Sequence, residues 1–381
     1  MRKVYFDNAA TTPLRSEVID SMTHVLKTEF GNPSSTHEFG RSSKALIETA
    51  RKQIAEILHV SAAEIIFTSG GTEADNLVIN SCVKNLNVTR IISSKIEHHA
   101  VLHAIQDLQT SYGITVEYVN LDQRGAVDFA HLERLLADTT QKTLVSLMHI
   151  NNEVGNILDL KHVAQLCKKY DSLFHSDTVQ SIGHYPLDFT DIPIDFAAVA
   201  AHKFHGPKGV GFAFVRQNSN LGPYITGGMQ EKGLRAGTES VHNIVGMSEA
   251  LKISINNLAA EKKYITGLKT YFIDEIENKI KNVKFNGNSA DLTSSTYTLV
   301  NVLIPVKRKT GGLFMFKLDM KGIACSKGSA CHSGSETGSH VLREIQDNID
   351  NDQVSLRFSF SIYNTKDEID FVISQINELA N

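Results

Sequence analysis

The sequence lacks the features that define several classes of protein. Its 381 residues include no tryptophan, seven prolines and four cysteines. No apolar run approaches the roughly 20 residues that a membrane-spanning helix needs, and the first residues lack the apolar block of a signal peptide. The formal net charge of -4 at pH 7, without a basic tail, argues against a general nucleic-acid surface. These absences predict a cytoplasmic globular protein that binds neither membrane nor nucleic acid.

The four cysteines do not form the pattern of a disulfide framework. They are Cys82, Cys167, Cys325 and Cys331, and no two are spaced as Cys-x-x-Cys. Cys331 lies in a run of small polar residues, 322–338, that cannot pack a core and is expected to be mobile. A thiol there is free to enter a site and react, provided that it becomes a thiolate. Cys331 is therefore a candidate nucleophile, whereas Cys325, which follows apolar residues, is expected to be structural or a secondary thiol.

Apolar periodicity divides the chain into two parts. Strands and helices alternate over the first 250 or so residues, which predicts an α/β fold with a mostly parallel sheet covered on both faces. The predicted strands are 64–68, 90–94, 115–119, 143–148, 173–180 and two runs within 196–215, and the predicted helices are 15–28, 42–58, 77–83, 100–112, 128–136 and 160–170. Residues 31–40 are predicted to form a loop, and residues 244–280 a long helical stretch with one polar break. We expect a large domain of residues 15–255 and a small α+β domain, made of 1–14 and 256–381, that carries the cysteine loop at about 322–340.

Lys203 is the residue around which the rest of the prediction is built. It lies with His202, His205 and Lys208 in a short polar segment between two runs of small and β-branched apolar residues. A strand end that holds an amine away from bulk water disfavours the ammonium form, so the pKa of Lys203 is expected to be lowered. Such an amine is a usable nucleophile and can form a Schiff base. The alternative is that Lys203 ends a strand and points to solvent.

Two further features complete a minimum set for pyridoxal 5′-phosphate. Ser69-Gly-Gly-Thr72 follows a strand and precedes a helix, so its backbone amides could cradle a phosphate. It is neither a GxGxxG fingerprint nor a P-loop, and a bare turn is the alternative. Asp177 follows the apolar part of its strand, where a carboxylate could keep a pyridine nitrogen protonated or simply cap a turn. Together with Lys203, these residues predict a pyridoxal-phosphate enzyme with its ligand beyond the carboxyl ends of the strands.

Two more side chains are candidates for the same site. His98 follows a strand, and its flat imidazole suits the face of a pyridine ring, with ordinary turn packing as the alternative. His99 and His103 have metal-ligand spacing, but no cysteine or carboxylate completes a ligand set, so no metal is predicted. The guanidinium group of Arg357 can donate two parallel hydrogen bonds, which suits an α-carboxylate; a surface ion pair is the alternative.

Ten segments in this order resemble the cysteine desulfurases of the NifS/IscS type, within the class-V aminotransferase family of fold-type I pyridoxal-phosphate enzymes. The segments are 7–13 (Asp-Asn-Ala-Ala-Thr-Thr-Pro), 68–73 (Thr-Ser-Gly-Gly-Thr-Glu), 97–98 (Glu-His), 151–155 (Asn-Asn-Glu-Val-Gly), 176–181 (Ser-Asp-Thr-Val-Gln-Ser), 201–203 (Ala-His-Lys), 205–209 (His-Gly-Pro-Lys-Gly), 235–239 (Arg-Ala-Gly-Thr-Glu), 328–331 (Gly-Ser-Ala-Cys) and 357–359 (Arg-Phe-Ser). The resemblance implies a homodimeric transferase that takes sulfur from L-cysteine and leaves L-alanine. It also implies an enzyme-bound persulfide that is passed to an acceptor protein, for iron-sulfur cluster assembly or thiolation.

The resemblance assigns a role to each matching residue. Cys331 would be the nucleophile, Arg357 would bind the substrate carboxylate, and Asn152 would lie between cofactor and substrate. Lys203 would bind the cofactor through an imine. The cofactor ring would contact His98, stacked on its face, Asp177, at the ring nitrogen, and Gln180, at the phenolic oxygen. The phosphate would be bound by Gly71, Thr72 and His202, and by Thr238 from the partner subunit.

The sequence also departs from the family pattern. Ala200 stands where many members have a serine on the phosphate, and residues 360–365 read Phe-Ser-Ile-Tyr-Asn-Thr instead of the usual Leu-Gly-Arg type.

The sequence leaves two other enzymatic functions as alternatives, that of a selenocysteine lyase and that of another fold-type I enzyme such as an aminotransferase. A third reading, from a different class, is an inactive scaffold that only binds partners.

Overall fold

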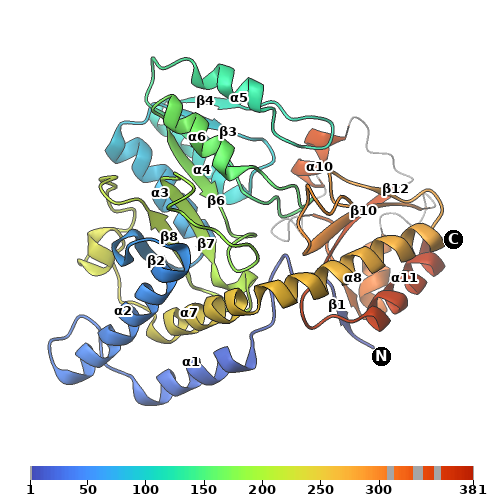
Figure 1. Ribbon diagram of the computed structural model, residues 1–381, viewed down its shortest axis with the longest axis horizontal. Helices are drawn as coiled ribbons and strands as arrows, with labels where there is room; N and C mark the ends of the chain where they lie inside the picture. Colours follow the sequence, from blue (N-terminus) through green and yellow to red (C-terminus); the bar gives the residue numbers. More distant parts are fainter. Residues whose placement is uncertain (1, 307–312, 329–337, 347–352, 381) are drawn as a thin grey trace.

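The computed structural model describes residues 2–306, 313–328, 338–346 and 353–380 (Figure 1). Cys331 lies outside the described residues.

A seven-stranded sheet organises the larger part of the chain. Its strands, in spatial order, are β2 (Ile65–Thr68), β8 (Gly211–Val215), β7 (Phe196–Ala200), β6 (Leu173–Asp177), β5 (Thr143–Ser146), β3 (Arg90–Ser93) and β4 (Thr115–Tyr118). Strand β8 runs antiparallel to both of its neighbours, whereas β7, β6, β5, β3 and β4 pair in parallel. Every residue of β2, β3, β5, β7 and β8 is buried, as expected for a sheet covered on both faces. The predicted α/β fold with a mostly parallel sheet is confirmed.

Helices cover the two faces of this sheet. They are α1 (Ser16–Thr28), α2 (Glu38–Leu58), α3 (Gly71–Leu86), α4 (His99–Tyr112), α5 (Phe129–Leu136), α6 (Leu160–Lys169) and α7 (Val241–Asn256). Apolar residues of α3 and α4 pack with one set of strand side chains, and those of α2, α5, α6 and α7 pack with the alternate set. This alternation follows from the pleat, which points successive side chains to opposite faces.

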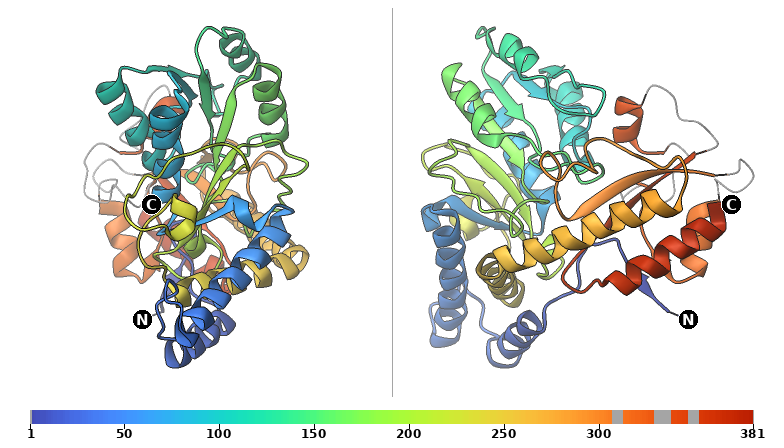
Figure 2. Two further views of the ribbon diagram at one scale, coloured as in Figure 1. Left: turned by 90° about the vertical axis from the view of Figure 1, so that its left-hand side faces the viewer. Right: turned by 45° about the vertical axis from the view of Figure 1, so that its right-hand side comes forward.

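The remaining elements form a second apolar core. An antiparallel sheet of β12 (Gln353–Ser359), β10 (Leu299–Pro305) and β9 (Lys284–Phe285) packs with α8 (Leu258–Lys279), α9 (Phe314–Met320) and α11 (Lys366–Ala380). The first strand, β1 (Val4–Tyr5), joins this core by pairing with β11 (Ile323–Ala324), so the start of the chain lies beside its last third (Figure 2). Helix α10 (His340–Ile345) packs through Val341 and Leu342 in a small separate cluster. The division into domains at residues 255 and 256 stays a prediction.

Three predicted boundaries were wrong for local reasons. Helix α2 begins at Glu38, inside the predicted loop, because the Nδ1 atom of His37 accepts a hydrogen bond from the backbone N–H of Gly40 over 3.3 Å. Helix α3 begins at Gly71, so the glycine turn itself opens the helix. Strand β6 ends at Asp177 and leaves the following polar residues in a turn. Within the described ranges, no helix has the length and apolar character needed to cross a membrane.

Candidate active site

A cavity of about 190 Å³ lies where the strands of the large sheet end and the second core begins. Nine of the residues predicted for the site line it: Gly71, Thr72, His98, Asn152, Asp177, Gln180, His202, Lys203 and Arg357. Thr238 does not line it, and Cys331 lies outside the described residues. Residues that are 286 positions apart in the chain therefore meet in one site, since Gly71 and Arg357 both face it.

Lys203 ends a short 3₁₀ turn, Ala201–Lys203, that directly follows β7. Its Nζ atom donates hydrogen bonds to the backbone oxygens of Ala9 and Ala10, each over 2.7 Å. Ala9 and Ala10 line the same cavity, so the start of the chain holds the amine at the cavity wall. The expected lowering of its pKa stays a prediction.

The glycine turn before α3 has the form of a phosphate cradle. Gly70 has a φ of 150°, which L side chains rarely adopt, and Gly71 opens a helix of 16 residues. A Cβ atom on Gly71 would lie 2.6 Å from Cγ2 of Val179, so a side chain there would collide with the cavity wall. Nearby, Nδ1 of His202 is buried, and no described residue forms a hydrogen bond with it. A helix N-terminus and an unpartnered imidazole nitrogen beside one cavity suit an anion such as the cofactor phosphate.

Two titratable groups flank the space for a pyridine ring. Asp177 is 7% exposed, and burial raises its pKa to about 6, against the opposing effect of Lys203. Burial lowers the pKa of His98 to about 4, with further lowering from Lys203, His340 and His103. His98 is therefore neutral at pH 7, and its Nδ1 atom accepts a hydrogen bond from Ala100 N–H over 3.1 Å that fixes the ring at the start of α4. A carboxyl group at one side and a flat neutral imidazole at another fit pyridoxal 5′-phosphate.

Gln180 lies in the turn after β6. Its side-chain Nε2 donates to the backbone oxygen of Ala9 over 2.9 Å. The same oxygen accepts a hydrogen bond from Lys203, so one carbonyl positions both side chains toward the cavity.

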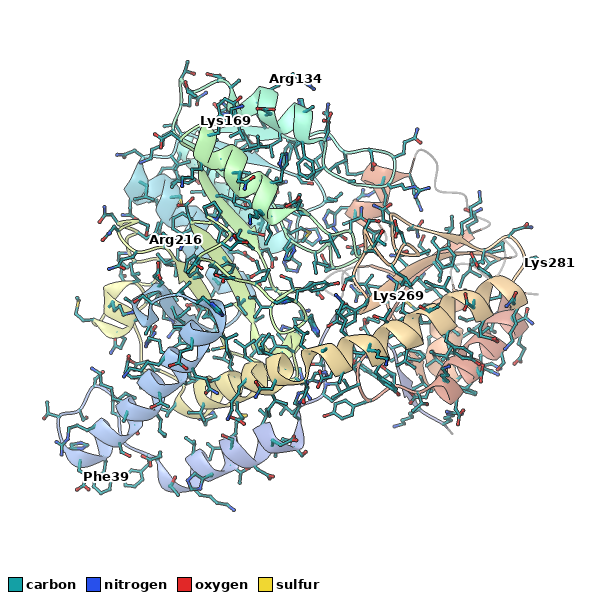
Figure 3. All side chains as sticks on the ribbon, viewed as in Figure 1. Phe39, Arg134, Lys169, Arg216, Lys269 and Lys281 are labelled. Carbon is teal, nitrogen blue, oxygen red and sulfur yellow. The ribbon has the colours of Figure 1, made fainter. Side chains whose placement is uncertain are left out.

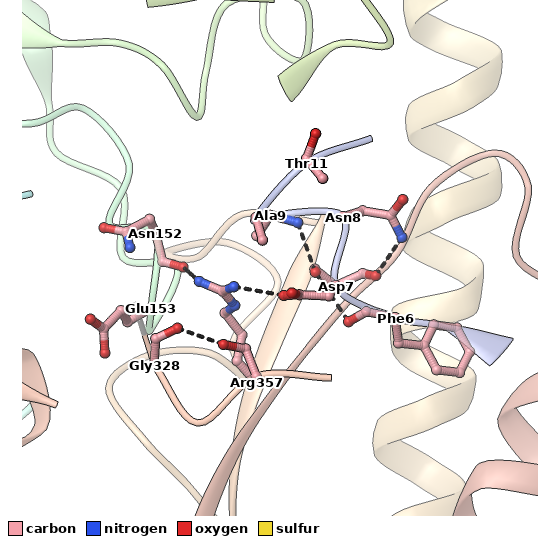
Figure 4. A network of polar contacts seen from close by, with 12 residues as sticks. Phe6, Asp7, Asn8, Ala9, Thr11, Asn152, Glu153, Gly328 and Arg357 are labelled. Atoms are coloured by element: carbon pink, nitrogen blue, oxygen red, sulfur yellow. Dashed lines mark hydrogen bonds and ion pairs between the residues drawn. The ribbon is translucent and has the colours of Figure 1, made fainter. Parts of the chain in front are cut away.

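Arg357 belongs to β12 and reaches the cavity from the second core (Figure 4). It is 1% exposed, its Nη1 donates to the backbone oxygen of Asn152 over 2.6 Å, and its Nη2 donates to Oδ1 of Asp7 over 2.8 Å. Its Nε is buried and has no hydrogen-bond partner within the described part of the chain. An unused donor on a buried guanidinium is suited to a carboxylate in the cavity.

The described ends of the Cys331 segment lie next to Asn152. At one end, a Cβ on Gly328 would lie 2.7 Å from Oε2 of Glu153. At the other end, Ser339 Oγ donates to the same Oε2 atom over 2.5 Å. Ser326 also exchanges backbone hydrogen bonds with Arg357, over 3.1 and 2.7 Å. Gly328 and Ser339, which are described on either side of residues 329–337, thus both lie beside Glu153.

Two buried acids of the site were not singled out from the sequence. Asp75 lines the cavity from α3 and is 1% exposed, and burial together with Asp177 and Glu97 raises its pKa well above the usual value. Glu97 accepts from the backbone N–H of Met148 over 2.9 Å, and burial is the main cause of its raised pKa. The available signal for Asp75 was an acidic residue on the apolar side of the helix that follows the glycine turn.

The comparisons with known proteins agree with this geometry. Residues 4–372 match the family model described as Aminotransferase class-V. "Cysteine desulfurase IscS" of Dictyoglomus turgidum is 40% identical over 380 residues, covering 99% of this chain and 94% of the relative. "Putative cysteine desulfurase IscS 1" of Bacillus subtilis is 38% identical over 372 residues, covering 97% and 96%.

Solved structures give the same result. A structure titled "NifS-like protein" superposes with a TM-score of 0.90 at 34% identity and covers 99% of both chains. A second, titled "SspA in complex with cysteine", has a TM-score of 0.82 at 30% identity and covers 95% of this chain and 99% of that one. Fold, cavity and matches define a pyridoxal-phosphate-dependent enzyme. The chain belongs to the class-V aminotransferase family, among relatives named as cysteine desulfurases, which confirms the resemblance seen in the sequence.

Proposed function

We propose that this protein is a cysteine desulfurase that removes sulfur from L-cysteine, releases L-alanine and keeps the sulfur as a persulfide on Cys331. The observation that carries the proposal is the meeting of an amine, a carboxyl group and a guanidinium, those of Lys203, Asp177 and Arg357, in one cavity. The relatives named as cysteine desulfurases support it over nearly the full length of the chain.

The residues of the cavity divide into those that hold the cofactor and those that hold the substrate. Pyridoxal 5′-phosphate, bound through Lys203, supplies an electron sink that makes the Cα proton and the C–S bond of the substrate labile. The turn at Gly71 and Thr72, with His202, would hold its phosphate, joined by Thr238 of the partner subunit. Asp177 would pair with the ring nitrogen, His98 would stack on the ring, and Gln180 would donate to the phenolic oxygen.

Arg357 and Lys203 act on the substrate itself. The guanidinium of Arg357 binds the α-carboxylate and thereby fixes the Cα–H bond in one orientation, with Asn152 beside it. The free amine of Lys203 then takes the Cα proton, as a general base within reach of the substrate. Both side chains are held by backbone oxygens, of Asn152 for the arginine and of Ala9 and Ala10 for the lysine.

The sulfur transfer uses the thiolate of Cys331. Its sulfur bonds to the substrate sulfur, the substrate C–S bond breaks, and the bonding electron pair stays with the carbon, which takes up a proton and becomes the methyl group of alanine. The amine of Lys203 returns a proton to Cα. The two sulfur atoms of the persulfide are oxidised while the carbon is reduced, so no outside oxidant is needed. The positions of Gly328 and Ser339 beside Glu153, on either side of Cys331 in the chain, support this proposal.

Partners and location extend the proposal. We place the enzyme as a homodimer that passes its persulfide to an acceptor protein for iron-sulfur cluster assembly or thiolation, and the names of the relatives support that role. A cytoplasmic location stays a prediction.

The test is turnover of L-cysteine with a thiol reductant present. The wild type is expected to form alanine and sulfide in equal amounts, and Cys331→Ser is expected to keep the visible absorbance of the cofactor while forming neither. Alanine formation at the wild-type rate by Cys331→Ser would instead indicate a lyase that needs no thiol. An inactive scaffold would form no alanine at all.

A further inference from the structure

A pair of buried polar groups, one of which lines the cavity, has no role in the machinery assigned above. Oδ1 of Asp75, on α3, is 3.4 Å from Nε2 of His175, on β6. The side chain of Asp75 is 1% exposed and that of His175 is 0% exposed. Each of these two atoms is buried and has no hydrogen-bond partner among the residues that the structure describes. Two facing polar atoms that are both unpartnered need one proton between them, because a buried polar group left unpaired is costly.

The other nitrogen of His175 is already bonded. Its Nδ1 lies 2.9 Å from Oγ of Ser146 on the neighbouring strand, and Ser93 Oγ in turn donates to the backbone oxygen of Ser146 over 2.9 Å. The hydroxyl of Ser146 can donate to Nδ1 or accept from it. The position of the proton on His175 is therefore decided at Nε2, by Asp75.

The carboxyl group of Asp75 is held in its neutral form by its surroundings. Burial has the largest effect, and the neighbouring charges of Asp177 and Glu97 raise its pKa further. Lys203, which lines the same cavity, lowers the pKa of Asp177. Strands β7 and β8, which also pack against α3, carry no titratable side chain. His175 does not supply a positive charge either, since burial lowers its pKa to about 3.

We propose that Asp75 is a protonated acid that donates its proton to Nε2 of His175, so that the pair is an uncharged positioning unit behind Asp177. His175 then carries its own proton on Nδ1 and donates it to Ser146. The consequence for the site is electrostatic, because Asp177 is left as the single carboxylate on the ring-nitrogen side of the cavity. The opposite arrangement, an ionised Asp75 that accepts a proton from Nε2 of His175, would place the buried negative charges of Asp75 and Asp177 close to each other.

The pair also explains why Asp75 is an acid within the buried face of a helix. An asparagine there could donate to His175, but leucine or alanine would leave Nε2 unpartnered. The unit joins α3, which carries the glycine turn, to β6, which carries Asp177. It therefore fixes the phosphate end and the ring-nitrogen end of the cavity relative to each other.

The test reads the tautomer of one histidine in the holoenzyme. Among 16 histidines, ¹⁵N magnetic resonance with labelled imidazoles assigns His175 by its loss in His175→Gln. The expected result is a protonated Nδ1 and an unprotonated Nε2 in the wild type. In Asp75→Ala, the Nε2 signal is expected to move downfield, because this nitrogen loses the hydrogen bond that it accepts. A protonated Nε2 in the wild type, or an unmoved Nε2 signal in Asp75→Ala, overturns the proposal.

A second readout covers the case in which Asp75→Ala fails to fold. The pH midpoint of the visible absorbance of the bound cofactor in Asp75→Asn is expected to stay within about 0.5 pH unit of the wild type, because a neutral acid is replaced by a neutral amide. A larger downward shift would show that a negative charge had been removed, and would overturn the proposal. Asp195→Asn is the matched control, since Asp195 is a half-buried acid that accepts from Phe174 N–H at the far end of β6.

This inference rests on the proposed function for one point, the binding of pyridoxal 5′-phosphate in the cavity. Its readouts do not depend on sulfur transfer, so an active Cys331→Ser enzyme would contradict the proposed function and leave the tautomer of His175 as predicted.

Discussion

The guanidinium of Arg357 and the carboxylate of Asp7 are joined by a 2.8 Å hydrogen bond, although the two residues are 350 positions apart. Asp7 follows the first strand of the chain, and Arg357 lies on β12, so the bond ties the start of the chain to its last sheet (Figure 4). This sheet packs with α8, on which Lys269 is labelled in Figure 3. The bond orients the guanidinium, whose Nε has no hydrogen-bond partner among the described residues.

Replacing Arg357 with lysine keeps the positive charge and removes the paired hydrogen-bond donors of the guanidinium group. Because charge-assisted hydrogen bonds contribute about 1.5–3 kcal/mol each, we expect kcat/KM for L-cysteine to fall by about tenfold to a hundredfold, mainly through KM. Steady-state kinetics of Arg357→Lys test this, with Arg134→Lys on the exposed side of α5 as the control. An unchanged KM would place the substrate carboxylate elsewhere.

The two cysteines near the end of the chain are expected to differ in reactivity. Burial raises the pKa of Cys325 to about 12, so only about one molecule in ten thousand carries its thiolate at pH 8. Iodoacetamide is expected to modify Cys331 and to leave Cys325 unmodified in the folded protein, as peptide mass spectrometry would show. Cys325→Ser is expected to keep sulfide release within about twofold of the wild type, because buried structural cysteines are inert. A loss as deep as that of Cys331→Ser would give Cys325 a part in the transfer.

Lys203 is expected to be the lysine that binds the cofactor. Borohydride reduction of the wild type is expected to add a reduced cofactor to the peptide that contains Lys203. Lys203→Ala is expected to lack the corresponding visible absorbance. Lys208→Ala, five residues along and exposed, is the matched control and should retain it. An adduct on any other lysine would show that the site has been assigned to the wrong residue.

Lys269 provides a prediction about stability. This lysine on α8 is fully buried, and its Nζ donates to Ser295 Oγ over 2.8 Å and to the backbone oxygen of Thr296 over 2.7 Å. Burial lowers its pKa from 10.5 to about 7, so between these values the unfolded chain holds a proton that the folded chain has released. Stability should therefore rise with pH across this window, by about 2 kcal/mol from pH 7 to pH 9 for this group alone.

Lys269→Met removes that contribution. The free energy of unfolding, measured with urea at pH 7 and pH 9, is expected to rise less with pH in Lys269→Met than in the wild type. Lys263→Met, exposed on the same helix, should behave as the wild type does. An equal rise in all three proteins would show that Lys269 stays charged when buried.

Much of the fold follows from local patterns in the sequence. The alternation of buried strands and amphipathic helices was sufficient to predict the sheet, because a strand buried on both faces is apolar throughout, as β7 is. The start of α2 could not be predicted, since it depends on a histidine cap whose geometry has no periodic signal. The antiparallel direction of β8 depends on tertiary pairing with β2 and β7, which the pattern of its own residues does not encode.

Some residues of the site could also be predicted from the sequence, and others could not. Lys203, Asp177 and the glycine turn were predicted because each follows a strand, and the carboxyl ends of parallel strands meet at one edge. Ala9 and Ala10 were not predicted, because they act through backbone oxygens, and any residue type could supply these. Asp75 was overlooked because a single acid in a helix usually faces solvent, and only its distance to His175 reveals its role.

The most direct test of the account is the mass of the Cys331 peptide after the enzyme has reacted with L-cysteine in the absence of a reductant. One added sulfur atom on Cys331, with one alanine released per active site, is the predicted result. Release of alanine with no added sulfur on Cys331, or with the sulfur on Cys325, would contradict it.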